Sequence, residues 1–403
     1  SLSLSLSLSL SLSLSLRPSR SAPCRLPPSR PPRHAASCSS MRAPLSVVRH
    51  ARLPVWPAWQ GLVLGALSLA APLRPLAAAL EAPFGGRVCP ISLQQAEADP
   101  FVLLVHHRHS FRPLDPLRPL FAALVLPEGF PAHPHRGFET VTYVLPGRDG
   151  LAHRDSLGCK MRYGDGAVQW MTAGRGMLHE EMWDLKGECR EHELYQIWLN
   201  LPPEAKMESP RVQLLGAGDS VVEVERNGEM PVRVGKYPTL ELQEGRVRVR
   251  YLADSSGVAP GGAETRSPVT IAHVTLAGSG TQHELPLPQG WSCIVYVRSG
   301  AVDIGGTVAS RYDTCYMGRE GGPLALESRT RNGADVLVLA GEPIGAPIVA
   351  SGTMVMNTQG QVDDALRAYR EGAFGLPWEH TATDAEWVER CWQALPLMRS
   401  SRL

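Results

Sequence analysis

The stretch FPAHPHRGFETVTYV, residues 130–144, combines two histidines with a run of strand-forming residues. His133 and His135 are separated by one residue, and residues i and i+2 of a β-strand point to the same face of the sheet. The β-branched and aromatic residues from Phe138 to Val144 favour an extended conformation. The stretch therefore predicts a β-strand region that presents two imidazoles to one side.

A second stretch, MTAGRGMLHEEM at residues 171–182, offers partners for these histidines. His179 and Glu181 again stand at i and i+2, so in a strand they share a face while Glu180 points to the opposite side. Gly176, just before them, lets the backbone turn tightly or approach another element. We predict that two such strands lie side by side in a small barrel and that four side chains converge on one metal ion. The predicted ligands are His133, His135, His179 and Glu181.

The ligand types leave the identity of the metal open. Three imidazoles and one carboxylate suit Fe, Mn, Ni, Cu or Zn. On an octahedral ion, four protein ligands would leave two positions for a substrate or dioxygen. On a tetrahedral zinc, the same four ligands would close the site and make it structural.

A competing cluster of histidines lies in VHHRHSF, residues 105–111. His107 and His109 are also separated by one residue, with His106 beside them. No matching second stretch stands nearby in the sequence. We therefore expect these histidines to lie in a surface loop rather than to bind a metal.

Short β-rich runs separated by Gly, Pro and Asp fill most of the chain after residue 88. Many short strands without long helices between them predict a sandwich or barrel. We expect a first β unit over residues 88–220, with the metal site, and a second over 240–375. A helical pattern occurs only late, where Val362, Leu366 and Tyr369 recur at helical spacing. The residues from 376 to 403 form a separate tail.

Composition excludes several classes of protein. The chain has 403 residues, 43% of them hydrophobic, and a net charge of +1. This charge gives no support for direct nucleic-acid binding, which calls for a basic patch. The eight cysteines form no C-x-x-C pair, so a zinc knuckle or a disulfide framework is not indicated.

Residues 1–82 differ from the rest in composition. Residues 1–16 alternate Ser and Leu, and no acidic residue occurs before Glu81. The segment contains arginines, then the apolar run GLVLGALSLAA at 61–71, then small residues of the kind found at a cleavage site. This order is typical of a signal peptide or an organelle transit peptide. The apolar run is too short to span a membrane. We expect a disordered leader that directs the chain to a plastid, a mitochondrion or the secretory pathway.

The alternative for this leader is that the segment before Met41 is an over-extended translation. In that case the protein would be cytoplasmic or nuclear. Folded structure is expected to begin near residues 83–88.

Beyond the histidine spacing, several long stretches resemble the pirin family within the cupin superfamily. They include GFPAHPHRGFETVTYVLPG at 129–147, VQWMTAGRGMLHEEM at 168–182 and AGEPIGAPIVASGTMVMNT at 340–358. The resemblance covers roughly residues 95–375. It implies an all-β bicupin, with two jelly-roll barrels packed together and a short C-terminal helix.

The resemblance also bears on the metal. The family's ligands fall on the same four residues that the spacing indicates, and the usual metal in the family is iron, as Fe(II). The second barrel holds His273 and His283 without an H-x-H pattern, and by resemblance it is expected to be metal-free. The general cupin pattern H-x-H-x-x-x-E would instead make Glu139 the carboxylate ligand. Because pirin-like proteins use the later carboxylate, we expect Glu181 to bind the metal. Glu139 is expected not to bind it but to orient one of the metal ligands.

The resemblance implies two kinds of activity. The first is an iron-dependent dioxygenase that opens a flavonol-like, quercetin-type substrate with O₂, in which Glu181 is both ligand and catalytic base. Trp170, Met171 and Met177 would then pack a flat aromatic substrate, unless they only fill the barrel core.

The alternative is a non-enzymatic iron redox sensor that binds protein partners such as transcription factors, and a purely structural metal is a third possibility. In the tail, Trp378, Trp387 and Trp392 could cap the barrel or meet a partner; capping is the simpler expectation.

Overall fold

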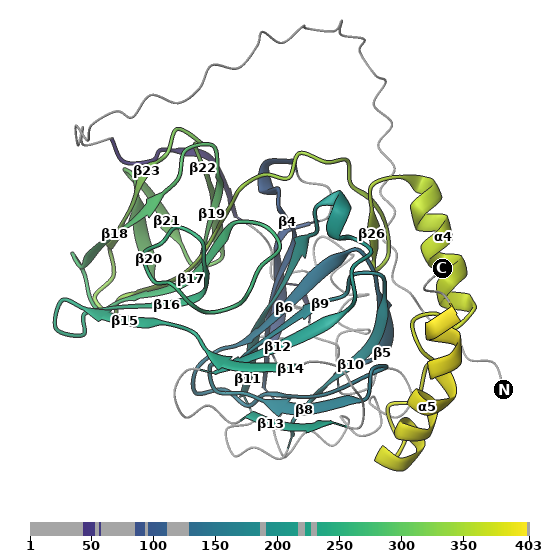
Figure 1. The fold of residues 1–403 in the computed structure, drawn as a ribbon. Coiled ribbons are helices and arrows are strands. Elements are labelled where there is room, and N and C mark those ends of the chain that lie inside the picture. Colours follow the sequence, from purple (N-terminus) through teal and green to yellow (C-terminus); the bar gives the residue numbers. More distant parts are fainter. Residues whose placement is uncertain are drawn as a thin grey trace, which may run out of the picture. The chain divides into compact units, whose positions relative to one another are not determined.

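The structure, a computed structural model, describes residues 43–52, 56–57, 85–92, 96–110, 129–185, 191–216, 222–226 and 232–400. The fold is all-β with two cupin barrels and short helices, as the sequence predicts (Figure 1). Each barrel combines a large sheet with a smaller one.

The first barrel extends beyond the predicted limit at residue 220, because its last strand ends at Lys236. Its large sheet runs in the order β14 (Val232–Lys236), β12 (Arg211–Gly216), β9 (Val168–Thr172), β6 (Phe138–Val144), β11 (Glu191–Asn200), β4 (Phe101–Ser110), β3 (Gly85–Ile91) and β2 (Trp56–Pro57). Its smaller sheet runs β13 (Val222–Arg226), β8 (Cys159–Tyr163), β7 (Leu151–Asp155), β10 (Met177–Trp183) and β5 (Gly129–His135).

The second barrel starts at Thr239 but also takes a strand from near the N-terminus. Its large sheet runs β1 (Val47–Arg52), β22 (Asp313–Met317), β19 (Ser292–Ser299), β24 (Ala334–Gly341), β17 (Val269–Leu276), β16 (Val247–Asp254) and β15 (Thr239–Leu242). Its smaller sheet runs β18 (Gln282–Leu287), β23 (Gly322–Ser328), β20 (Ala301–Ile304) and β21 (Thr307–Ser310).

The remaining elements are short. They are two 3₁₀ turns at Ala96–Ala98 and Pro203–Ala205, a hairpin of β25 (Val349–Ser351) and β26 (Met354–Met356), and the helices α4 (Gln359–Arg370) and α5 (Asp384–Ser400). Among the described residues, no helix is long and apolar enough to cross a membrane.

The large sheets of the two barrels share an apolar core. In β6 every residue is buried, because both faces of the strand are covered. Val141 and Tyr143 belong to a cluster that includes Ile271 and Leu337 of the second barrel. Thr142, which lies between them in the strand, faces the interior of the first barrel, where it contacts Glu181. One strand thus serves the inter-barrel core on one side and the barrel interior on the other.

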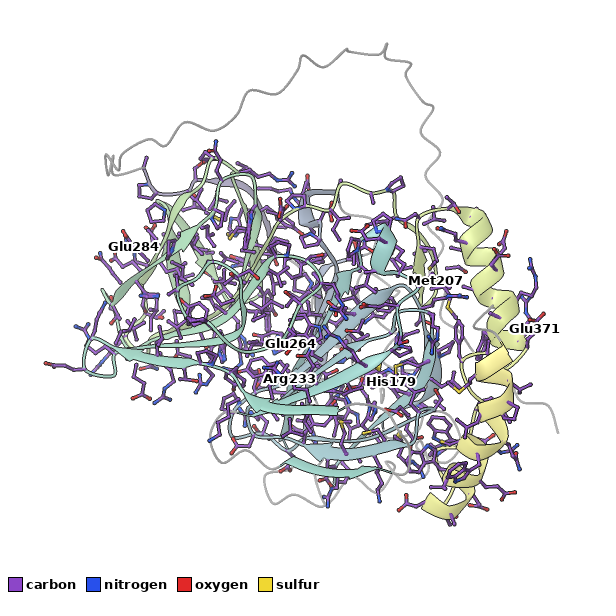
Figure 2. All side chains as sticks on the ribbon, in the orientation of Figure 1. His179, Met207, Arg233, Glu264, Glu284 and Glu371 are labelled. Carbon is purple, nitrogen blue, oxygen red and sulfur yellow. The ribbon has the colours of Figure 1, made fainter. Side chains whose placement is uncertain are left out.

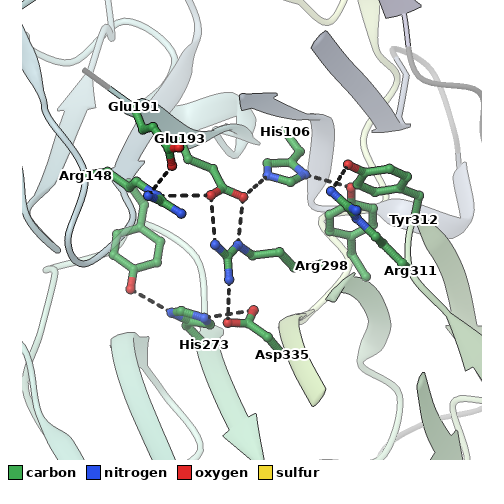
Figure 3. A network of polar contacts seen from close by, with 11 residues as sticks. His106, Arg148, Glu191, Glu193, His273, Arg298, Arg311, Tyr312 and Asp335 are labelled. Atoms are coloured by element: carbon green, nitrogen blue, oxygen red, sulfur yellow. Dashed lines mark hydrogen bonds and ion pairs between the residues drawn. The ribbon is translucent and has the colours of Figure 1, made fainter. Parts of the chain in front are cut away.

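A chain of buried polar contacts also joins the barrels, and we refer to it as the inter-barrel network (Figure 3). Arg298 donates through Nε and Nη2 to the Glu193 carboxylate, at 2.8 Å each, and through Nη1 to Asp335 Oδ2 at 3.0 Å. Asp335 Oδ1 lies 3.0 Å from His273 Nε2, and His273 Nδ1 lies 2.8 Å from the Tyr143 hydroxyl. Each buried charge therefore has a partner of opposite charge or a hydrogen-bonding group.

The two C-terminal helices pack on the first barrel. The predicted helix is α4, which begins with a capping box between Thr358 and Gln361. The longer α5 was not predicted. Trp378 and Trp387 are buried in a cluster with Leu178 of β10, whereas Trp392 is 60% exposed. Two of the three tail tryptophans therefore cap the barrel.

Most of the predicted leader lies outside the described residues, but residues 43–52 and 56–57 are exceptions. They include β1, which pairs with β22 at the edge of the second barrel. Leu45 is buried in the core of that barrel, and Arg52 donates to Asp313 at 2.8 Å. A strand of the second barrel therefore lies before the expected start of folded structure near residues 83–88.

Candidate metal centre

Strand pairing brings the three predicted histidine ligands together. Strands β5 and β10 are antiparallel neighbours, and His133 lies directly opposite His179. His135 is two residues along β5, so its side chain extends from the same face of the sheet. Figure 2 shows His179 among the strands of the first barrel. The predicted arrangement of two i, i+2 strands side by side is the one observed.

The three imidazoles converge through their Nε2 atoms. His179 Nε2 lies 2.8 Å from His135 Nε2 and 3.1 Å from His133 Nε2. A single proton can bridge only one such pair, whereas a cation can bind all three nitrogens. Two nitrogens at 90° on an ion with bonds of about 2.1 Å would be about 3.0 Å apart, and at the tetrahedral angle about 3.4 Å. The observed spacing would allow the three histidines to hold one ion.

The protonation of the three histidines also suits a metal. Burial lowers the pKa of His135 and of His179 well below the ordinary value, and neighbouring imidazoles lower it further. Burial also lowers the pKa of His133, although the Pro131 carbonyl and Glu181 oppose this shift. His133 Nδ1 donates to the Pro131 oxygen at 2.7 Å, which leaves Nε2 as the lone-pair nitrogen. Neutral imidazoles are the form that coordinates metals.

Glu181 lies on the same strand as His179 and is buried. Its Oε1 accepts hydrogen bonds from Tyr163 Oη at 2.7 Å and Thr142 Oγ1 at 2.8 Å, and its Oε2 accepts one from Gln196 Nε2 at 3.0 Å. Among the described residues, the donor atoms that all lie within 4.8 Å of one another belong to the three histidines, without Glu181. Its role as fourth ligand stays a prediction.

Glu139 faces away from the three histidines. The chain bends at Gly137, which has φ +85° and where an added Cβ would meet the Val355 oxygen at 2.1 Å. The bend breaks the strand alternation, so Phe138 packs on the His135 ring and Glu139 points to the other side. There Glu139 accepts a hydrogen bond from Thr172 Oγ1 at 2.6 Å, and burial raises its pKa to about 7. No hydrogen bond among those described for Glu139 reaches a ligand histidine.

The sequence reasoning missed a second histidine and carboxylate pair in the barrel interior. His153 and Asp155 on β7 lie opposite Glu181 and His179 of β10, respectively. His153 Nε2 is 3.2 Å from Asp155 Oδ2, and the His153 ring centroid is 5.4 Å from that of His179. The H-x-D spacing of 153–155 is the same i, i+2 signal that identified the ligands, so it could have found this pair.

The expectation that residues 106–109 form a surface loop is wrong. They lie in β4, between β3 and β11 in the large sheet, and their histidines are buried. His106 contacts Glu193 at 3.0 Å and the Tyr296 hydroxyl at 2.9 Å, so it is part of the inter-barrel network. His107 and His109 pack their rings near Trp183.

The apolar side chains expected near the substrate belong to the core. Trp170 is buried in the inter-barrel cluster, and Met171 and Met177 are buried inside the first barrel. The aromatic groups that do adjoin the centre are Phe138 and Trp198. Their ring centroids lie 5.1 and 5.7 Å from that of His135. Trp198 and His133 are each half-buried, whereas His135 and His179 are buried.

The chain after α4 contacts β7 and β10 from outside the barrel. Trp387 Nε1 of α5 donates to the Asp155 main-chain oxygen of β7 at 3.1 Å, and Trp378 Nε1, which precedes α5, donates to Glu180 Oε2 of β10 at 2.8 Å. Glu180 is thus the outward-facing neighbour of His179, as predicted. At Gly176, an added Cβ would lie 2.4 Å from the Phe374 ring, so the glycine allows the C-terminal segment to approach.

The comparisons with known proteins agree with this architecture. The family profile described as Pirin matches residues 87–199, and the Pirin C-terminal cupin domain matches 271–375. Pirin-1 of Arabidopsis thaliana is 33% identical over 288 residues, covering 70% of this chain and 86% of that protein. Pirin of Homo sapiens is 34% identical over 256 residues, covering 62% and 79%.

A solved structure shares the fold. The crystal structure of a quercetin 2,3-dioxygenase from Acinetobacter baumannii superposes with a TM-score of 0.64 and 26% identity, covering 83% of this chain and 99% of that one. Two cupin barrels, the three converging histidines and these matches lead to one conclusion: the chain belongs to the pirin family.

Proposed function

We propose that this protein is an iron-dependent dioxygenase that acts on a flavonol-like, quercetin-type substrate. Convergence of the three Nε2 atoms, at 2.8 and 3.1 Å, is the observation that carries the proposal. His133, His135 and His179 would hold one divalent ion, with Fe(II) preferred over Mn, Ni, Cu or Zn, and Glu181 would be the fourth ligand. When bound, such an ion supplies a Lewis acid and open positions for a substrate oxygen and O₂.

The protein residues around the centre can do three things for such a substrate. Glu181 can accept the proton of a substrate hydroxyl, since a ligand carboxylate lies within reach of a group at the metal. Phe138 and Trp198, whose ring centroids are 4.6 Å apart, offer an aromatic wall for a flat ring system. The buried strands β6 and β10 beside the histidines exclude bulk water from the part of the centre that they cover.

Similarity to the Acinetobacter baumannii quercetin 2,3-dioxygenase supports the choice of substrate class. The test is to load the full chain with Fe(II) under anaerobic conditions, add quercetin and follow O₂ uptake. We expect uptake by the wild-type protein and none by His179→Ala, which should also lose the metal. A fully loaded wild-type protein that consumes no O₂ would refute the dioxygenase proposal for this substrate.

One observation favours the alternative of an iron redox sensor with a protein partner. Strands β6 and β11 each contribute to both the metal centre and the inter-barrel network. Thr142 and Gln196 face Glu181, while Tyr143 and Glu193 of the same strands contact His273 and Arg298 of the second barrel. A change of charge at the centre would act on strands that also hold the barrels together. Hydrogen exchange of β6 and β11 in the Fe(II) and Fe(III) forms tests this candidate, which requires a difference between them.

A further inference from the structure

Met207 is the most exposed of the methionines that the structure describes (Figure 2). It is 52% exposed, whereas the other described methionines are buried or half-buried. It lies in the connection between β11 and β12 of the first barrel, shortly after the 3₁₀ turn at Pro203–Ala205. A thioether in such a position is open to oxidants, which convert methionine to methionine sulfoxide.

The Met207 sulfur lies against a buried cation. Arg136 Nη2 donates to Met207 Sδ at 3.4 Å. Arg136 is 9% exposed, its Nε has no hydrogen-bond partner among the described residues, and none of the ion pairs found there involves it. The centroid of the Phe374 ring lies 5.3 Å from Arg136 Cζ. Because a thioether is only a weak acceptor, this guanidinium lacks the oxygen acceptor that a buried charge normally has.

A neighbouring contact holds the sulfur in this position. The buried Lys206, which directly precedes Met207, donates through Nζ to the Gly137 oxygen at 2.8 Å. It also donates to the Val355 oxygen at 3.0 Å. Since Gly137 directly follows Arg136 in the chain, this anchor places Met207 beside Arg136.

We propose that Met207 is a peroxide-sensitive modification site whose sulfoxide oxygen is bound by Arg136. In the reaction, the Met207 sulfur donates an electron pair to one oxygen of hydrogen peroxide. The S–O bond forms as the O–O bond breaks, and the other oxygen leaves as water with both protons. Sulfur is thereby oxidised by two electrons and the peroxide is reduced by two.

The product fits this position better than the thioether does. A sulfoxide oxygen is a polar acceptor, and a hydrogen bond from a charged donor is roughly twice as strong as one between neutral groups. Because Met207 is half exposed, rotation about its side-chain bonds can turn the new oxygen toward Arg136. Oxidation usually disrupts a methionine that packs in a core. At Met207 it would instead tie the β11–β12 connection to the end of β5, the strand that carries His133 and His135.

The test treats the full chain with hydrogen peroxide in a buffer that contains Zn(II), which has no redox chemistry of its own. Peptide mass spectrometry should find Met207 oxidised first among the described methionines, and the midpoint of thermal unfolding should rise as Met207 is oxidised. Methionine sulfoxide reductases should return the midpoint to its starting value. Met207→Leu controls for oxidation elsewhere in the chain, and peroxide should not raise its midpoint.

Further variants test the role of Arg136. Met207→Gln carries an oxygen acceptor at the same place without any oxidation. In urea unfolding, its folding equilibrium constant should exceed that of Met207→Leu by about tenfold, as expected for a hydrogen bond to a charged group. This advantage should vanish in an Arg136→Met background. At Val308, which is 54% exposed in the second barrel, Gln and Leu variants should be equally stable.

Several outcomes would overturn the inference. A lower or unchanged midpoint in the peroxide-treated wild type would do so, as would an advantage of Met207→Gln that persists without Arg136. If Arg136→Met does not fold, the peroxide comparison is sufficient: a rise in the wild type alone supports the sulfoxide contact, and equal shifts in the wild type and Met207→Leu overturn it. None of these measurements depends on dioxygenase activity, so the inference and the proposed function can fail separately.

Discussion

Replacing Glu139 by glutamine should make the protein more stable at neutral and alkaline pH. Glu139 is fully buried on the side of β6 that faces away from the metal centre, and burial raises its pKa from the ordinary 4.5 to about 7. A glutamine at this position can still accept the hydrogen bond from Thr172. It cannot ionise, so the cost of burying a charge disappears.

The pH range and the size of the effect follow from these two values. The unfolded chain releases the Glu139 proton near pH 4.5, whereas the folded protein keeps it up to about pH 7. The stabilisation by this carboxyl is therefore complete below pH 4.5 and is lost as pH rises through 7. Since one pKa unit corresponds to about 1.4 kcal/mol, the stability difference between the two proteins should change by about 3 kcal/mol in favour of the variant.

Urea unfolding of both proteins at pH 4 to 8.5 measures this difference. The variant should gain on the wild type between pH 4.5 and 7 and keep its lead above that range. Glu379→Gln, at an exposed glutamate, should show no such change. A difference between Glu139→Gln and wild type that is constant with pH would show that Glu139 has the same pKa in the folded and unfolded states, and the reasoning from burial would be wrong.

Three further predictions concern packing and charge. Gly176→Ala should lower the midpoint of thermal unfolding, since its Cβ would meet the Phe374 ring at 2.4 Å at a φ of +122°; an unchanged midpoint would contradict the close approach. Arg298→Ala should cost about 3–5 kcal/mol in urea unfolding because Glu193 is left buried without its main partner; a loss below 1 kcal/mol would show that the ion pair is not needed. Burial lowers the pKa of Lys206 to about 7. The unfolded lysine keeps its proton up to pH 10.5, so wild-type stability should rise between pH 7 and 10.5, and Lys206→Met should remove that rise.

The strand periodicity was sufficient to find the three histidines, because a period of two needs only local backbone geometry. The same rule, which would place Glu139 on the same face as His135, failed. Glu139 lies four positions after His135, but the bend at Gly137 lies between them, so each later residue points to the face opposite to the one that strict alternation predicts. The bend exists because β26, more than 200 residues later in the chain, approaches Gly137, and no local pattern encodes that contact.

Long-range burial explains the other difference. The polar run at residues 106–109 resembles a loop by composition, yet it is a strand. His106 contacts Glu193 of β11 and Tyr296 of the second barrel, while His107 and His109 pack near Trp183. The donors to Glu181 are also remote from one another in sequence, since Tyr163, Thr142 and Gln196 come from three strands. Helix α5 was also not predicted. It contains Pro396, and a proline usually marks the end of a helix.

The position of β1 has a consequence for how the protein could be matured. The apolar run at 61–71, with its small-residue exit, lies in sequence between β1 and β3, and both strands belong to the folded body. A peptidase that cut at that exit would sever an edge strand of the second barrel, together with Leu45 of its core, from the rest of the chain. We therefore expect any presequence that is removed on import to end before Leu45. N-terminal sequencing of the protein isolated from its native compartment would find β1 still attached.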